Sequence, residues 1–317
     1  MTEPAQPIPH WPGEMVSLGS HEVFVRRAPA GQDAEPALLV HGLEGSSRNW
    51  TDLMDLLRTR LACDALDLPG FGDSPPRPDS RYSIAALAQT VIALIEQRQT
   101  RVHLIGNSLG GAVCVKVAAA RPDLTRTLTL ISPALPDLRP RLDLVRFPAI
   151  ALPRVGSRLI RRYQAALPPE RRVAAVIATC YSNPGLFPQA RFAAEVAELS
   201  RRDSLEYAAA ALMGSARALT SEFLRKDRHS PWRDAALVTA PTLVIYGQHD
   251  RLVDPRAAGR AAHVFRDARI VVLPRTGHVA QMERPRLVAA EIGILLASAG
   301  PGAEADRARE FPLAPAG

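Results

Sequence analysis

The sequence is poor in lysine, and what replaces lysine argues against one class of partner. Lys116 and Lys226 are the only lysines, so arginines supply nearly all of the 39 basic residues and the net charge of +7. The arginines are scattered among acidic residues and form no basic stripe with interleaved aromatic side chains. This skew, together with abundant alanine and proline, indicates genome composition rather than a basic patch. We therefore expect no nucleic-acid partner.

Cysteine is also scarce, and long apolar runs are absent. Cys63, Cys114 and Cys180 lie far apart without CxxC spacing, which argues against a disulfide framework or a zinc site and suits a reducing cytoplasm. The histidines show no HExxH or other metal spacing. Residues 1–14 do not have the pattern of a secretory signal, and no stretch reaches the length of a transmembrane helix. We therefore expect a cytoplasmic protein without a metal and without stable membrane insertion.

Apolar runs of strand length alternate with segments of helical periodicity in two parts of the chain. This pattern is typical of an α/β fold with a mostly parallel central sheet flanked by helices. The expected strands are 16–18, 23–27, 37–40, 61–68, 102–106, 128–131, 242–246 and 269–273, and the expected helices are 84–97, 109–120, one from 255, and 285–298.

The alternation stops after the sixth expected strand. Residues 136–232 are rich in arginine, helical in tendency and without a convincing strand. A structureless loop of this length is improbable in a compact domain, so we predict a folded helical cap there. The expected organisation is a core in two parts, 15–135 and 233–298, separated by the cap and followed by a disordered tail, 299–317.

One segment has the features of a catalytic nucleophile. The sequence GNSLG at 106–110 has the form G-x-S-x-G and joins an expected strand to a helix rich in small residues. Glycines flank the serine because a sharp strand-to-helix turn leaves no room for neighbouring Cβ atoms. The turn exposes the serine Oγ at the carboxyl edge of the sheet, where the helix dipole favours negative charge. A structural serine at a helix N-cap is the alternative, but the required context is present, so we predict Ser108 as the nucleophile.

A serine nucleophile needs a base and a group that orients the base. The next two expected strands are followed by GQHD and TGH, and open α/β sheets bind ligands at such carboxyl ends. We predict Asp250 as the acid and His278 as the general base, because their order after the serine is the one this fold uses. A loop carboxylate and a surface histidine are the alternatives for each residue alone. Asp254 suits a helix start better, and His249 suits a solvated loop.

The third requirement is an oxyanion hole. One donor is expected to be the backbone N–H of Leu109, directly after the nucleophile. The other is expected from the turn HGLEG at 41–45, at the N–H of Leu43, because the two glycines let that backbone turn inward. The alternative is that His41 and Gly42 merely close a strand.

With these pieces in place, the chain resembles the α/β-hydrolase superfamily over nearly all of residues 15–298. The resemblance rests on five blocks in the right order: HGLEGSSRNW at 41–50, DLPGFGDS at 67–74, GNSLGG at 106–111, YGQHDRLVD at 246–254 and GHVAQMERP at 277–285. It implies a nucleophile at Ser108, an acid at Asp250 and a base at His278. It also implies oxyanion donors at Leu43 and Leu109.

The resemblance also separates branches of the superfamily. Epoxide hydrolases and haloalkane dehalogenases use Asp where this chain has Ser108, which disfavours them. The blocks GNSLGG and GHVAQMERP are similar to those of meta-cleavage-product C–C hydrolases and of carboxylesterases. The C–C hydrolases usually carry an HG-x-G-P-G loop, whereas this chain has Leu43 and Glu44 there, which favours an esterase or lipase-like enzyme. Asp73 and Ser74 are interpreted as structural residues of a neighbouring loop.

The expected reaction is a two-step acyl transfer on a small-molecule ester with an apolar acyl or aromatic group, without a metal or organic cofactor. The alternatives are a C–C bond hydrolase, an acyltransferase, and a slow-turnover small-molecule receptor of the same fold. Arginines of the predicted cap suggest an anionic substrate or a membrane surface, but a solvated helix face explains them better.

Overall fold

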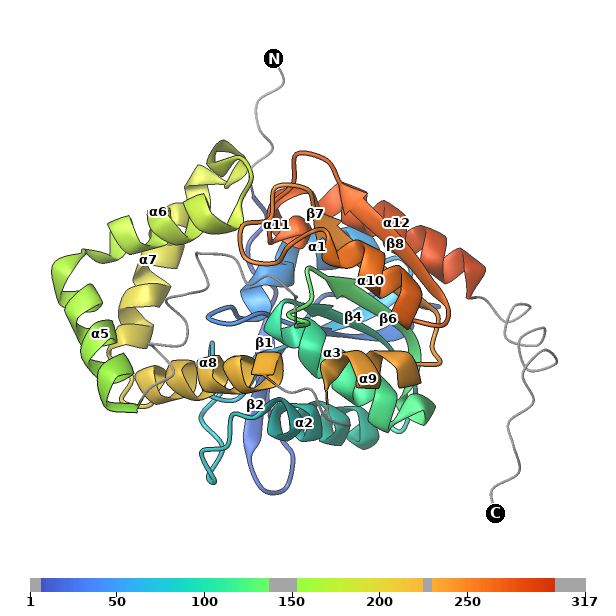
Figure 1. Ribbon diagram of the computed structural model, residues 1–317, viewed down its shortest axis with the longest axis horizontal. Helices are drawn as coiled ribbons and strands as arrows, with labels where there is room; N and C mark the ends of the chain where they lie inside the picture. The colour runs from blue at the N-terminus through green and yellow to red at the C-terminus, as the bar shows by residue number, and fades with distance from the viewer. Residues whose placement is uncertain (1–6, 137–152, 225–229, 300–317) are drawn as a thin grey trace.

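The computed structural model describes residues 7–136, 153–224 and 230–299, and its centre is one eight-stranded sheet with the order β1-β2-β4-β3-β5-β6-β7-β8 (Figure 1). The strands are β1 (Gly13–Ser17), β2 (Glu22–Arg27), β3 (Glu35–Val40), β4 (Leu61–Leu66), β5 (Val102–Asn107), β6 (Thr125–Ile131), β7 (Thr242–Gly247) and β8 (Ala268–Leu273). Strands β3 to β8 pair in parallel, and the β1–β2 hairpin is antiparallel. The predicted α/β fold is confirmed.

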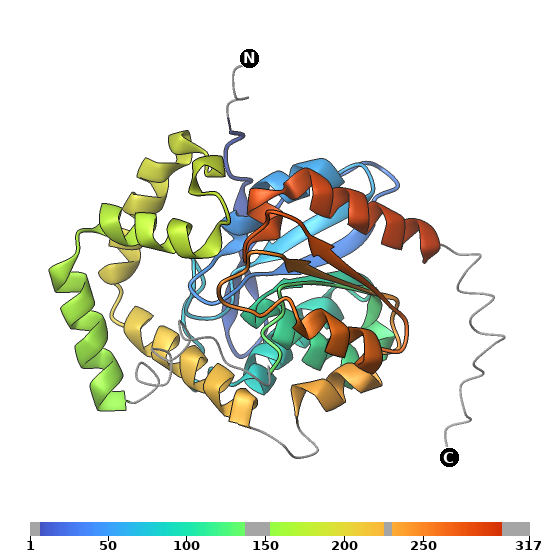
Figure 2. The ribbon, with the colours of Figure 1, turned by 45° about the horizontal axis from the view of Figure 1, so that its top comes forward.

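Helices cover both faces of the sheet (Figures 1 and 2). One face carries α1 (Thr51–Leu57) and α12 (Pro285–Ser298), and the other carries α2 (Ile84–Gln97), α3 (Leu109–Ala120), α9 (Pro231–Leu237) and α10 (Ala257–Val264). Side chains of β3 alternate between the two cores: Leu38 and Val40 enter one, and Ala37 and Leu39 enter the other. A strand buried on both sides therefore has a continuous apolar sequence.

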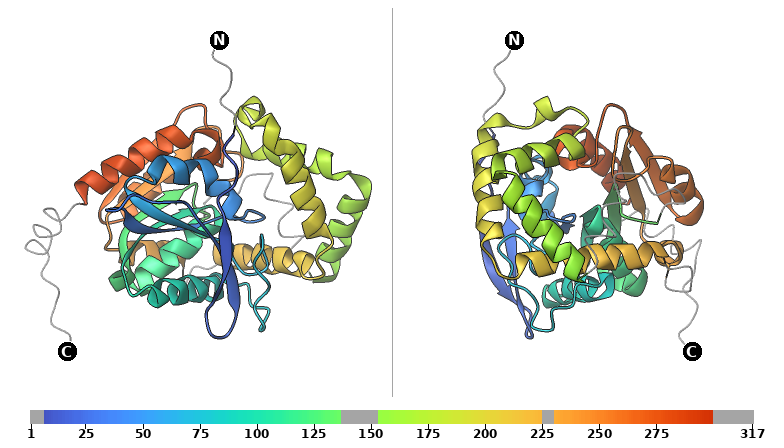
Figure 3. Two further views of the ribbon diagram at one scale, coloured as in Figure 1. Left: turned by 180° about the vertical axis from the view of Figure 1, so that it is seen from behind. Right: turned by 60° about the vertical axis from the view of Figure 1, so that its left-hand side comes forward.

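Before α9, the described part of the long interval between β6 and β7 also forms helices and one 3-10 turn. They are α5 (Pro153–Ala166), α6 (Pro169–Cys180), the 3-10 turn η4 (Pro184–Leu186), α7 (Gln189–Asp203) and α8 (Ala208–Leu224). We call residues 153–224 the insertion; it lies to one side of the core (Figure 3). The indole Nε1 of Trp232 donates to the carbonyl of Pro136 over 2.6 Å, so the two ends of the predicted cap meet. Parts of that prediction, 137–152 and 225–229, lie outside the described residues.

Some predicted boundaries are correct and others shift. The helices at 84–97, 109–120 and 285–298 have the predicted bounds. The strand predicted to end at Leu68 ends at Leu66, because the Leu68 N–H donates to His41 Nε2 and the Asp67 carboxylate accepts from Ser47 and Asp73. The helix predicted from residue 255 begins at Ala257. Of the predicted tail, only residue 299 is described.

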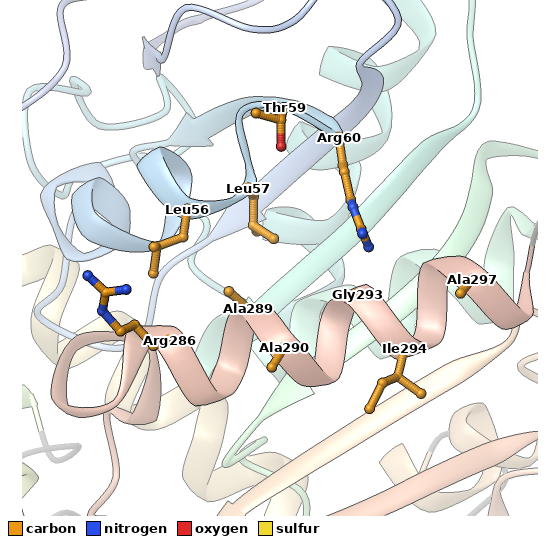
Figure 4. A pocket seen from close by; sticks show the side chains of 10 residues that line it. All are labelled: Leu56, Leu57, Thr59, Arg60, Arg286, Ala289, Ala290, Gly293, Ile294 and Ala297. Carbon is orange, nitrogen blue, oxygen red and sulfur yellow. The ribbon is translucent and has the colours of Figure 1, made fainter.

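The remaining short elements are the 3-10 turns η1 (Ser47–Trp50) and η2 (Pro122–Leu124) and helix α11 (Ala280–Glu283). An open groove of about 610 Å³ runs between α1 and α12, where small residues of α12 face α1 (Figure 4). Its lining contains none of the predicted catalytic residues. Within the described residues, no helix combines the length and the apolar character needed to cross a bilayer.

Candidate active site

Ser108 occupies the sharp turn between β5 and α3. Its backbone has φ 53° and ψ −116°, a region that a residue with a Cβ rarely adopts. A Cβ at Gly106 would stand 2.6 Å from the carbonyl oxygen of Gly110, and a Cβ at Gly110 would overlap the carbonyl of Val40. Both flanking glycines are therefore required by the close approach of β3, β5 and α3, as the G-x-S-x-G pattern predicts.

Backbone hydrogen bonds hold this strained turn in place. The Ser108 N–H donates to Ile131 O over 3.0 Å, and Ser108 O accepts from the N–H groups of Ala112 and Ala134 at 3.1 and 2.9 Å. The Ser108 side chain is partly exposed, whereas Leu109 behind it is fully buried. The turn thus presents the hydroxyl group outward from a rigid base.

Asp250 and His278 come together from the ends of β7 and β8. His278 Nδ1 lies 2.9 Å from Asp250 Oδ2 and 3.1 Å from Oδ1. Both side chains are buried, with 0% exposure for Asp250 and 4% for His278. The Asp250 Oδ1 atom also accepts the N–H groups of Leu252 and Val253 at 2.8 and 2.9 Å. These bonds fix the carboxylate plane against the imidazole.

The environment keeps Asp250 charged. Burial alone would raise the pKa of its carboxyl, but the electrostatic attraction of the His278 imidazole and the hydrogen bonds from His278 and the Val253 N–H outweigh burial and hold that pKa below its ordinary value. A carboxylate at Nδ1 requires the proton on that nitrogen, so Nε2 of neutral His278 is left as the acceptor.

The backbone of His278 is held from two directions. Its carbonyl accepts Asn107 Nδ2 at 3.2 Å, and the same amide donates to Ile131 O at 2.9 Å. Its N–H donates to the carbonyl of Cys180 in the insertion at 2.7 Å. Asn107 directly precedes Ser108, so the strand end that carries the serine also anchors the histidine.

The HGLEG turn after β3 stands beside the serine. A Cβ at Gly42 would lie 3.1 Å from the Ser108 Cβ, so a side chain there would press against the serine. The Gly42 carbonyl accepts His41 Nδ1 at 2.7 Å and the Gly45 N–H at 3.1 Å. That carbonyl belongs to the same planar peptide unit as the Leu43 N–H, which therefore points in the opposite direction.

The buried side chain of His41 holds this turn in place through hydrogen bonds, so His41 does more than end a strand. Its Nε2 accepts the Leu68 N–H at 2.9 Å, which leaves the proton on Nδ1 for the Gly42 carbonyl. Burial lowers the pKa of His41 to about 4. The imidazole is therefore neutral, in one tautomer, near pH 7. Leu109 is the first residue of α3, where backbone N–H groups have no acceptor within the helix.

The competing residues have other partners. Asp254 accepts the Arg256 N–H and pairs with the Arg256 guanidinium, as a residue at a helix start does. His249 Nδ1 contacts the hydroxyl of Ser182 at 3.1 Å. Ser74 bridges the carbonyl of Asp67 and the N–H of Phe24 across the loop, at 2.6 and 2.7 Å. These contacts agree with the structural interpretation of the DLPGFGDS block.

Sequence reasoning missed Glu283. Its carboxylate is 5% exposed and accepts three backbone N–H groups, from Gly277 at 2.6 Å, Ser182 at 3.1 Å and Asn183 at 3.0 Å. It thus ties the loop that carries His278 to the insertion. The only signal was its place inside the block GHVAQMERP, because its partners at 182 and 183 follow no sequence pattern. Within the described residues, no three His, Cys, Asp or Glu side chains are grouped to hold a metal ion.

A strained serine turn beside a buried aspartate–histidine pair, at the carboxyl edge of a mostly parallel sheet, defines a class of hydrolytic enzymes. The chain belongs to the alpha/beta hydrolase family, whose model matches residues 37–291.

Individual relatives differ in activity. The chain is 28% identical over 255 residues to the dihydrolipoyllysine-residue acetyltransferase component of the acetoin cleaving system from Pseudomonas putida, covering 80% of this chain but only 61% of that protein. It is 28% identical to 2-(acetamidomethylene)succinate hydrolase from Mesorhizobium japonicum, covering 88% and 92%. The structure matches 2-hydroxy-6-oxo-6-phenylhexa-2,4-dienoate hydrolase from Rhodococcus sp. strain RHA1 with a TM-score of 0.72 and 20% identity, covering 90% and 100%. That likeness supports the fold alone.

Proposed function

We propose that this protein is a serine hydrolase that cleaves a carboxylic ester with an apolar acyl or aromatic group through an acyl-enzyme. The observation that carries the proposal is the buried Asp250–His278 pair, 2.9 Å apart, which the Asn107 amide links to the strained turn of Ser108. A charged acid, an oriented imidazole and an accessible serine hydroxyl are the three groups that acyl transfer by a serine requires, and Ser108 is partly exposed.

In the first step, His278 Nε2 takes the proton of the Ser108 hydroxyl as Oγ attacks the ester carbonyl carbon. The C=O π bond becomes an oxyanion, and the imidazolium is stabilised by Asp250. The N–H groups of Leu43 and Leu109 donate to the oxyanion. The tetrahedral intermediate then expels the alcohol, which receives the proton from His278 and leaves the acyl group on Ser108.

In the second step, His278 removes a proton from water, and the hydroxide oxygen attacks the acyl carbon. The second intermediate collapses, Ser108 regains its proton from His278, and the carboxylic acid leaves. The mechanism needs no metal or organic cofactor, because the charges that develop are stabilised by side chains and backbone groups of this chain.

We further propose that the insertion is the cap over the reacting atoms. Val279, directly after His278, is 8% exposed and packs in an apolar cluster with three insertion residues, Val173, Ile177 and Tyr181. Apolar insertion side chains thus reach the residue next to the general base, which supports an apolar acyl or aromatic substrate.

The test is hydrolysis of a series of p-nitrophenyl esters of increasing acyl length, with Ser108→Ala as the matched variant. We expect turnover by the wild-type protein, a fall of about 10⁴-fold or more in kcat for Ser108→Ala, and an unchanged melting temperature. Near-wild-type turnover by Ser108→Ala contradicts the proposal. If no ester is cleaved but a fluorophosphonate labels Ser108, the ester assignment is wrong, and C–C bond hydrolysis is the next activity to assay.

A further inference from the structure

Helix α7 of the insertion touches helix α1 and two loops of the core through charged side chains. Arg191 forms two contacts of 2.7 Å with the Asp52 carboxylate. Arg201 donates to the Gly72 carbonyl at 2.8 Å and lies 3.2 Å from Asp73. In Figure 1, α7 lies between the outer helix α5 and the core. A further arginine of α7 contacts a different part of the core, the turn that carries the proposed oxyanion donor.

That contact is made by Arg202. Its Nη1 donates to the carbonyl of Glu44 over 2.7 Å. The guanidinium carbon also stands 6.0 Å from the centre of the Phe71 ring, and Phe71 packs edge-on against the imidazole of His41 at 5.7 Å. Arg202 therefore contacts the turn directly at a backbone carbonyl and indirectly, through the Phe71 ring, at the buried His41.

The bond to Glu44 connects with Leu43 through two peptide units. The Glu44 carbonyl and the Gly45 N–H belong to one planar unit, and that N–H donates to the Gly42 carbonyl at 3.1 Å. The Gly42 carbonyl and the Leu43 N–H belong to the second of the two planar units. A donor at one end of this chain of hydrogen bonds therefore orients the N–H at the other end, and polarisation along such chains reinforces each bond.

The turn needs such a constraint at this place. Glu44 is exposed and has φ 59°, in the left-handed region that a non-glycine residue adopts only when its surroundings hold it there. His41 and Gly45 fix the inner side of the turn from within the core. Arg202 holds the outer side from the insertion.

We propose that Arg202 is a positioning residue for the oxyanion hole: its guanidinium fixes the Glu44–Gly45 peptide, and through it the direction of the Leu43 N–H. This inference rests on the proposed function, since it assigns the oxyanion to Leu43. It follows that the insertion contributes to the rate of the chemical step as well as to the shape of the substrate site.

The experiment compares Arg202→Ala with Arg201→Ala, the adjacent arginine, which also donates to a core carbonyl but not in this turn. With the best p-nitrophenyl ester, we expect Arg202→Ala to lower kcat about 10- to 100-fold with KM within about threefold, because misplacing a donor weakens transition-state binding more than substrate binding. Arg201→Ala is expected to keep kcat within about threefold. Arg202→Lys retains a donor and should recover part of the rate.

A second measurement detects the oxyanion directly. A trifluoromethyl ketone of matching chain length accepts Ser108 Oγ at its carbonyl carbon, its oxygen becomes an oxyanion, and the serine proton passes to His278. Its inhibition constant should rise in Arg202→Ala by the same factor as kcat/KM falls, as expected for a transition-state analogue. Melting temperatures of the two alanine variants should agree, which separates positioning from loss of stability.

The outcomes distinguish the two proposals. If Ser108→Ala is inactive but Arg202→Ala matches Arg201→Ala in kcat and in ketone inhibition, the role of Arg202 is overturned and the serine hydrolase stands. A fall in kcat that Arg202→Lys does not recover, with unchanged ketone inhibition, also overturns it. Retained turnover in Ser108→Ala refutes the proposed function itself, whatever Arg202→Ala does.

Discussion

The core and the insertion are held by different forces. In the core, buried apolar side chains on both faces of the sheet form two large clusters, and site residues are bound mostly by buried backbone and side-chain hydrogen bonds. The described insertion has one small apolar cluster, which also contains Val279 of the core, and Ala211 and Leu219 of α8 pack in one of the core clusters. Five of the ten exposed large apolar side chains of the described residues are in the insertion: Val155, Leu159, Tyr163, Val176 and Leu186.

Besides these apolar contacts, helix α7 of the insertion meets the core through arginines that donate to a carboxylate and to backbone carbonyls. Apolar burial is insensitive to salt, whereas exposed ion pairs weaken as the ionic strength rises. The site therefore has a rigid part, built on strands, and a part whose position depends in part on electrostatics. Four experiments test this division, and their expected effects decrease in the order given.

Asp250→Asn should show how strongly the rigid part controls the chemistry. An amide can keep the bonds to the N–H groups of Leu252 and Val253, but its NH₂ group then faces His278 Nδ1 and favours the wrong tautomer. We expect kcat to fall about 10³- to 10⁴-fold with little change in stability. Asp254→Asn, in the same loop, is the control and should retain activity. Equal loss in both variants would refute the assignment of the acid.

A pH titration of the free energy of unfolding should show the contribution of the buried His41. The folded-state pKa of His41, about 4, lies below the 6.5 of an unperturbed histidine. Between these values the unfolded chain binds more protons, so the free energy of unfolding falls as pH decreases from about 6.5 to about 4. We expect wild type to lose about 2–3 kcal/mol more than His41→Gln across this window. The exposed His263→Gln variant should follow wild type in denaturant titrations. Parallel curves for wild type and His41→Gln would contradict the expectation.

Glu283→Gln tests the junction between the two regions. The amide can accept with one oxygen, but its NH₂ group must face backbone N–H donors from Gly277, Ser182 or Asn183. Leaving such buried donors unpaired should lower the free energy of unfolding by about 1–3 kcal/mol. We also expect a lower kcat, since His278 follows Gly277. Chemical denaturation and ester kinetics measure the two effects. Full activity in a destabilised variant would show that Glu283 contributes to stability and not to catalysis.

The smallest effect is expected from Arg191→Ala, which removes a bidentate pair between the insertion and the core. Its two side chains are 13% and 30% exposed, and a pair of this kind contributes about 1 kcal/mol at low salt. Arg269→Ala, which removes a more exposed pair with Glu291 within the core, is the control and should change stability by less than about 0.5 kcal/mol. Melting curves of Arg191→Ala and wild type should differ at low salt and should coincide at high salt. A difference that persists at high salt would show that packing, not charge, holds α7.

Local patterns predict the core well because their physical causes are local. The glycines of the Ser108 turn lie within two residues of the serine, and residues 37–40 of β3 are all apolar because both faces of the strand are covered there. The loop positions of Asp250 and His278 follow from strand periodicity. Contacts of the insertion have no such signal. Arg202 and Glu44 are 158 residues apart, and their bond ends on a backbone carbonyl that every residue possesses. Glu283 likewise acts on peptide N–H groups, so the sequence gives no sign of its partners.

Strands β6 and β7 pair side by side, with Leu128 opposite Thr242, although the whole insertion lies between them along the chain. The intervening segment therefore forms a closed loop on the sheet, and the hydrogen bond between Trp232 and Pro136 holds its two ends together. The entropy of closing a loop rises only with the logarithm of its length, by about 0.6 kcal/mol for each doubling. The segment is therefore nearly free to lengthen, shorten or be exchanged over evolutionary time without disturbing β-strand registry. If the insertion and Arg202 have the roles that we propose, new substrate preferences can arise by replacing this one module with another that supplies a donor for the turn after β3.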